Sequence, residues 1–155
     1  MIAVQGCYAR RKWSMICLLL ALAASSGCND RPELGTVAGS VMLDGKPLKF
    51  GKVMFQHVEG GQPATGEIQP DGSFVLSTFR PEDGAIVGAH RIRVVCYTSQ
   101  DPARRAAEGP AGDALGELLI PESYSSLGAS GLSAEVPPEG LSEFKIDLSS
   151  KGPKK

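Results

Sequence analysis

The stretch Glu143-Phe-Lys-Ile-Asp-Leu148 alternates charged and apolar residues without interruption. Successive side chains of a β-strand point to opposite faces of the sheet, so this period of two predicts a strand. Phe144, Ile146 and Leu148 would face the core, and the charged residues between them would face water. Such one-sided patterning is typical of antiparallel sheets, which bury one face and leave the other in solvent.

The same period of two recurs in six earlier stretches, which are separated by turn signals. The six stretches are residues 36–43, 52–57, 64–69, 73–78, 88–97 and 132–136. Turns are predicted at 44–47, 70–72 and 81–84, because each contains an Asp-Gly step in which Asp bonds nearby backbone N–H groups and Gly adopts positive φ. Seven or so short strands with regular turns predict an all-β fold, an antiparallel β-sandwich. No spacing typical of βαβ units occurs, and a parallel sheet is therefore not expected.

The N-terminal segment has the order of a secretory signal peptide. Residues 10–12 are basic, residues 13–24 form a short apolar run, and small residues then lead to Gly27-Cys28. The apolar run is shorter than the ~20 residues that a membrane-spanning helix needs. The junction resembles the lipobox of bacterial lipoproteins, whose cysteine is lipidated and becomes the mature N-terminus. The resemblance implies lipid attachment at Cys28, and the alternative is an ordinary signal peptide cut nearby.

Export would divide the chain into four parts. They are a signal peptide over 1–27, a short tether over 28–35, a β-sandwich domain over 36–149 and a disordered tail over 150–155. Within the domain, residues 99–119 are rich in Ala, Gly and Pro and are predicted to form a flexible loop. One helical turn is expected in this loop, around residues 102–107.

The charge of the mature chain argues against nucleic acid as a partner. Removal of the leader takes three of the 16 basic residues and none of the 17 acidic ones, which leaves a net charge of −4. A nucleic-acid-binding protein needs a clustered Lys/Arg surface, and no such stripe is present in the sequence.

A set of short motifs, taken in order, resembles the carboxypeptidase regulatory-like domain found in small lipoproteins of planctomycete bacteria. The motifs are Gly39-Ser-Val-Met-Leu-Asp-Gly-Lys-Pro-Leu48, Gly51-Lys-Val-Met-Phe55, residues 66–69, Asp71-Gly-Ser-Phe74, Gly88-Ala-His90, Ile120-Pro-Glu-Ser-Tyr124 and Ser130-Gly-Leu132. The resemblance covers residues 35–149. It implies a transthyretin-like sandwich with seven strands in Greek-key order, and it implies no activity, because related domains serve as accessory, adhesive or spacing modules.

The candidates for metal binding are weak in this sequence. His57 and His90 are the only histidines, and with an acid such as Glu59 or Asp83 they could contribute to a metal site. They are far apart in sequence, so a structural role is preferred, with His90 bonding the backbone at the start of a strand. The carboxylates of the Asp-Gly steps could bind calcium, but tight turns explain them more simply. No cofactor and no catalytic residue are therefore expected.

Other side chains suggest a buried thiol and a candidate ligand surface. Cys96 shares one strand face with Ile92 and Val94, which predicts a buried, inert thiol. A carbohydrate site would normally expose aromatic side chains. The candidates in the mature domain are Tyr97, Tyr124 and Phe79, since Trp13 is lost with the leader.

Together these observations predict a non-catalytic lipoprotein of the cell envelope that acts as a structural or protein-interaction module. Its partners would be the membrane, through the anchor at Cys28, and an envelope protein or glycan. A carbohydrate- or peptide-binding module is the alternative, and a hydrolase is the least favoured class.

Overall fold

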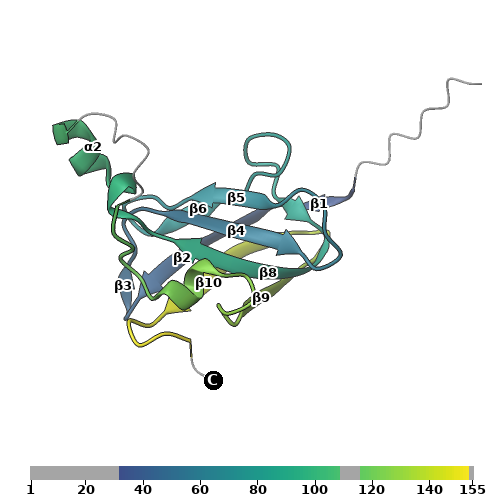
Figure 1. Cartoon of the computed structure of the whole chain (residues 1–155). Coiled ribbons are helices and arrows are strands. Elements are labelled where there is room, and N and C mark those ends of the chain that lie inside the picture. The colour runs from purple at the N-terminus through teal and green to yellow at the C-terminus, as the bar shows by residue number, and fades with distance from the viewer. Residues whose placement is uncertain (1–31, 109–115, 154–155) are drawn as a thin grey trace, which may run out of the picture. The chain divides into compact units, whose positions relative to one another are not determined.

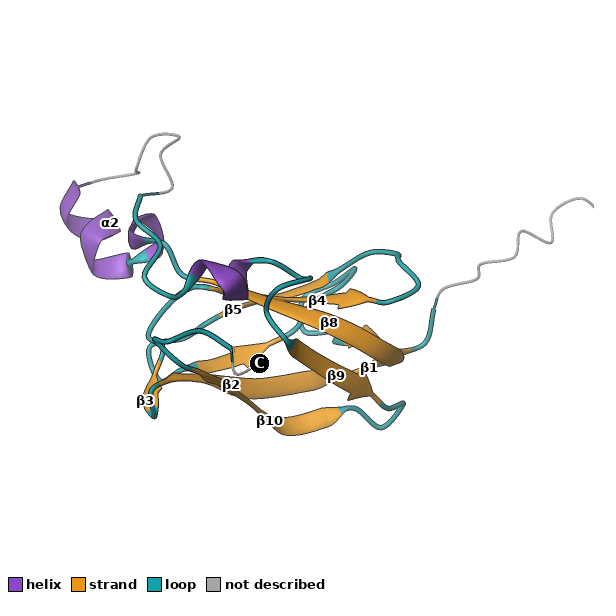
Figure 2. Ribbon diagram, turned by 60° about the horizontal axis from the view of Figure 1, so that its bottom comes forward, coloured by secondary structure: helices purple, strands orange, loops and turns teal. Residues whose placement is uncertain are grey.

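The computed structural model describes residues 32–108 and 116–153, and ten strands are the main regular elements in them (Figures 1 and 2). The strands are β1 (Leu34–Gly35), β2 (Val37–Leu43), β3 (Lys46–Pro47), β4 (Lys52–His57), β5 (Ala64–Glu67), β6 (Ser73–Val75), β7 (Ala85–Ile86), β8 (Gly88–Val95), β9 (Leu132–Val136) and β10 (Leu141–Leu148). Three short helices accompany them: η2 (Thr98–Gln100), α2 (Pro102–Glu108) and η3 (Glu122–Ser125). No helix in these residues is long and apolar enough to cross a bilayer.

Two four-stranded sheets lie in two layers, which are seen in Figure 2. One sheet has the order β5-β4-β8-β9, and in the other β2 pairs with β10, β3 and β6. A small third sheet joins β1 to β7. The all-β sandwich is confirmed, and each of the seven predicted stretches either contains a strand or lies inside one. The three additional strands, β1, β3 and β7, are only two residues long each, too short to show a period of two in the sequence.

One strand pair differs from the expected antiparallel arrangement. β10 runs parallel to β2, from Leu141 opposite Val37 to Leu148 opposite Leu43. Apolar alternation places side chains on the correct face but carries no information on strand direction, so the prediction of an entirely antiparallel sandwich was wrong here. A bulge interrupts the pairing between Ser142 and Phe144, where Glu143 has a φ of +88°.

The core lies between the two sheets and contains the alternating side chains that the sequence singled out. Phe55 is fully buried, and its ring centroid lies 6.4 Å from that of Phe74 and 5.8 Å from that of Phe144. Gly39 makes room for this cluster, since a Cβ there would lie 2.9 Å from Cζ of Phe74 and would collide with the backbone oxygen of Phe144. The close approach of three aromatic rings therefore depends on the absence of a side chain at Gly39.

The edges of the domain carry more order than the sequence suggested. β1 extends the folded unit two residues before the predicted start at residue 36. At the other end, the Ser150 N–H donates to Oδ1 of Asp44 at 3.1 Å. Helix α2 confirms the helical turn expected around residues 102–107, and it lies at the opposite end of the sandwich from β1 (Figure 1).

Candidate functional site

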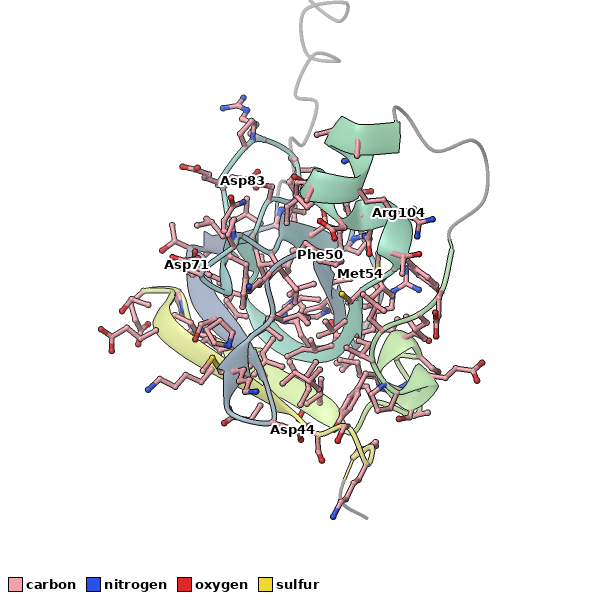
Figure 3. All side chains as sticks on the ribbon, turned by 90° about the vertical axis from the view of Figure 1, so that its left-hand side faces the viewer. Asp44, Phe50, Met54, Asp71, Asp83 and Arg104 are labelled. Atoms are coloured by element: carbon pink, nitrogen blue, oxygen red, sulfur yellow. The ribbon has the colours of Figure 1, made fainter. Side chains whose placement is uncertain are left out.

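Residues 77–84 form a loop, here called the Phe79 loop, in the connection between β6 and β7, and Figure 3 labels its residue Asp83. Four large hydrophobic side chains of the described residues are exposed, and Phe79, at 55% exposure, is the one aromatic among them. Arg80 follows it and is also exposed. The loop therefore presents an aromatic ring and a neighbouring cation to solvent.

Asp83 holds the backbone of this loop in place (labelled in Figure 3). Its Oδ1 accepts a hydrogen bond from the N–H of Thr78 at 2.6 Å. Its Oδ2 accepts from the N–H groups of Phe79 at 3.0 Å and Arg80 at 2.8 Å. Burial by itself would raise the pKa of Asp83, but these three backbone donors favour the carboxylate and the pKa is lowered overall. One charged side chain thus satisfies three successive donors.

Further contacts close the base of the Phe79 loop. The hydroxyl of Ser77 accepts from the N–H of Glu82 at 2.8 Å, and the hydroxyl of Thr78 donates to the Gly84 oxygen at 2.7 Å. Gly84 has a φ of +90°, and any side chain there would collide with the backbone oxygen of Gly35. The exposed ring is consequently carried on a backbone whose geometry is fixed before any partner arrives.

The two histidines, distant in the sequence, are brought together by the β4–β8 pairing. His57 lies directly opposite His90, and their rings meet edge to face with centroids 5.1 Å apart. His90 is buried, and its Nδ1 bonds the Gly88 oxygen at 2.9 Å, as expected for a structural role at the start of a strand. Nδ1 of His57 accepts from the N–H of Glu59 at 3.3 Å. No local sequence signal pairs them, because the pairing depends on the register of β4 against β8.

The environment of His90 disfavours its charged form. Burial lowers the pKa of His90 most, and the neighbouring His57 lowers it further. The bond to the Gly88 oxygen and the charge of Glu135 act in the opposite direction without outweighing burial. In the described part of the chain, no group of three or more His, Cys, Asp or Glu side chains is placed to hold a metal ion.

The other Asp-Gly steps serve as turns, as predicted. Asp44 and Gly45 both have positive φ, at +49° and +78°, which gives the tight hairpin between β2 and β3 the twist that such loops favour. Asp71 Oδ1 accepts from both the N–H and the hydroxyl of Ser73, at 2.9 and 2.6 Å. Figure 3 shows Asp44, Asp71 and Asp83 in three separate turns. The carboxylates of Asp71 and Asp83 bond within their own loops, whereas that of Asp44 accepts from the Ser150 N–H of the C-terminal segment.

The remaining candidates are mostly structural. Tyr124 is buried, and its hydroxyl accepts from the N–H of Ser149 at 3.1 Å, while Tyr97 pairs with Leu118 in an isolated bridge. Cys96 is buried as predicted, and burial, followed by the charge of Asp101, raises its pKa to about 11. Phe79 is thus the only one of the three predicted aromatic candidates that is highly exposed.

The predicted lipid-attachment residue, Cys28, lies outside the described residues. The sequence matches no protein-family model, and comparison with curated proteins and with solved structures gives no match either. The resemblance to the carboxypeptidase regulatory-like domain therefore stays a prediction.

Proposed function

We propose that the chain is an exported, lipid-anchored protein of the cell envelope whose β-sandwich acts as a non-catalytic interaction module. The main support for this proposal is the sequence of the N-terminal segment. A basic cluster, a short apolar run and small residues end at Cys28, four residues before the folded unit begins at Pro32. With two or three acyl chains, Cys28 would be a stable anchor, whereas a single chain gives only marginal membrane binding.

The Phe79 loop is the surface to which we assign binding. Aromatic residues and arginine are enriched where proteins meet their partners. A backbone already fixed by Asp83 loses little conformational entropy when it binds. The loop would therefore present Phe79 and Arg80 at the surface of the anchored domain.

The anchor can be tested with a clickable fatty acid supplied to bacteria that express the full-length chain. We expect label on the wild-type protein and its loss in Cys28→Ser. The leader supplies matched controls, since Cys7→Ser and Cys17→Ser should keep the label. Label that survives in Cys28→Ser, or that never appears in the wild type, would contradict the proposal.

The two alternative functions have less support. A carbohydrate-binding face usually needs several exposed aromatic rings, and Phe79 is the only strong candidate in the described residues. Reproducible glycan binding that disappears in Phe79→Ala would favour that alternative. A hydrolase would be favoured by turnover of a substrate that is abolished in His90→Ala while circular dichroism shows that the buried site has kept its fold.

A further inference from the structure

Two exposed hydrophobic side chains lie near β1, where the chain joins the sandwich. Val58 is 54% exposed and Phe79 is 55% exposed. The Val58 N–H donates to the oxygen of Ala89, close to the beginning of β8, at 3.0 Å. Phe79 belongs to the loop whose Gly84 lies directly against Gly35 of β1. Both loops therefore belong to the same end of the strands.

The β1–β7 pair connects these two loops to the incoming chain. Leu34 pairs with Ile86, and the Val87 N–H donates to the Glu33 oxygen at 2.9 Å. A methyl group added at Gly61, in the loop that follows Val58, would lie only 3.5 Å from Cδ1 of Ile86. The chain thus enters the domain between two loops that each expose an apolar side chain.

A third exposed hydrophobic residue, Leu119, marks the other end of the sandwich. It is 44% exposed, and its N–H donates to the Cys96 oxygen, just beyond the end of β8, at 2.8 Å. Ala89 and Cys96 are separated by about 23 Å at ~3.3 Å per strand residue. Figure 1 shows the two ends of the sandwich, with β1 at one end and α2 at the other.

The anchor would hold the β1 end of the sandwich nearest to the bilayer, because the chain enters the domain there. Cys28 precedes Leu34 by six residues, which span at most about 22 Å when fully extended. We propose that the Phe79 loop and Val58 form a second, non-covalent contact with the bilayer and insert their apolar side chains into its interfacial region. This inference rests on the lipid anchor proposed above. The anchor makes so small a contact effective, because tethering raises its effective concentration at the surface.

The charges of these loops indicate the kind of membrane surface that suits them. The exposed charges of the two loops are the cation Arg80 and the acids Glu82, in the same loop, and Glu59, in the loop that follows β4. Attraction to anionic headgroups is therefore not what drives the contact. Burial of apolar surface drives it, so the contact should form on zwitterionic phosphatidylcholine and should change little with salt.

The experiment uses tryptophan as a depth probe, because Trp13 of the leader is the only tryptophan in the chain. The polypeptide 28–155, which contains the whole compact unit, is coupled through the Cys28 thiol to a maleimide lipid in phosphatidylcholine vesicles. Cys96 does not compete, because it is buried and its pKa is raised to about 11. Chemical coupling replaces natural lipidation, so this result is independent of whether the cell acylates Cys28.

We expect the indole of Phe79→Trp to emit at shorter wavelength on vesicles than in buffer, to be quenched at least twofold by brominated acyl chains, and to be protected from iodide. Leu119→Trp, the matched control at the far end, should stay accessible to iodide and unquenched by bromine. Absence of bromine quenching in Phe79→Trp, or equal quenching in both variants, would overturn the proposal. Protection of Phe79→Trp from iodide only when an envelope protein or glycan is added would assign the loop to that partner instead. Far-UV circular dichroism confirms that both variants retain the sheet signature.

Discussion

Replacement of Asp83 by alanine is the most informative perturbation of the Phe79 loop. The change removes a carboxylate that accepts three backbone N–H bonds, at 2.6, 2.8 and 3.0 Å. Bonds to a charged group contribute about 1.5–3 kcal/mol each when they are buried, but this loop is largely exposed and its donors can turn to water. Loss of a side-chain cap on exposed backbone donors costs about 0.5–2 kcal/mol, so we expect a total loss near 2 kcal/mol.

The assay is urea unfolding of the sandwich at pH 7, followed by circular dichroism. A loss of about 2 kcal/mol would also lower the melting temperature by roughly 8 °C in a domain of this size. Asp71→Ala is the matched control and should cost less, because the Asp71 carboxylate accepts from one other residue, Ser73, rather than from three successive backbone N–H groups. A destabilisation by Asp83→Ala no larger than that of Asp71→Ala would refute the claim that Asp83 organises the loop.

The pH dependence of the same variant checks the electrostatic part of the argument. The pKa of Asp83 is lower in the folded protein than the ordinary value of 3.8. Its contribution to stability is therefore fully present above pH ~3.8 and is lost as the pH falls through the folded pKa. The difference between wild type and Asp83→Ala should shrink below pH 3.8, and a constant difference down to pH 2 would contradict this origin.

Three further predictions concern the interior. The pKa of His90 is below 6.5 in the folded state, so its contribution to stability is present above pH 6.5 and is lost on acidification below it. Urea unfolding should therefore show a lower free energy of unfolding at pH 5.5 than at pH 7.5, and His90→Gln should reduce this difference. An equal difference in His90→Gln would exclude His90 as its source. Cys96 should resist iodoacetamide at pH 8 until urea unfolds the domain, and rapid labelling of folded protein would contradict its burial. Gly39→Ala should lower the free energy of unfolding by about 1–3 kcal/mol through overpacking. Gly128→Ala is the control, because a Cβ there meets no neighbour within 4 Å and the residue has no positive φ, and equal losses in the two variants would rule out crowding.

Much of the fold was predictable because alternation is a local property of the sequence. Phe144, Ile146 and Leu148 alternate with charges and pack against the core as expected. The direction of β10 was not predictable in this way, because a strand shows the same alternation whether it runs parallel or antiparallel to its neighbour. The bulge at Glu143 likewise depends on pairing with β2, which no local pattern specifies.

The candidate site was only partly accessible from the sequence. Phe79 was one of three aromatic candidates in the sequence. It is exposed whereas Tyr124 is buried, and this difference depends on tertiary packing. The turn at Asp83 was expected from Asp-Gly, but its bonds to three successive N–H groups depend on how residues 77–84 close against β1. The pairing of His57 with His90 required the register of two strands that are distant in sequence.

The central claim is that a lipid on Cys28 attaches a β-sandwich to the envelope membrane. Its most direct test is the mass of the N-terminal peptide of the mature protein, purified from detergent-extracted membranes. The account predicts a peptide that begins at Cys28 and carries the added mass of two or three acyl chains. A peptide that begins elsewhere, or a Cys28 of unmodified mass, would contradict it.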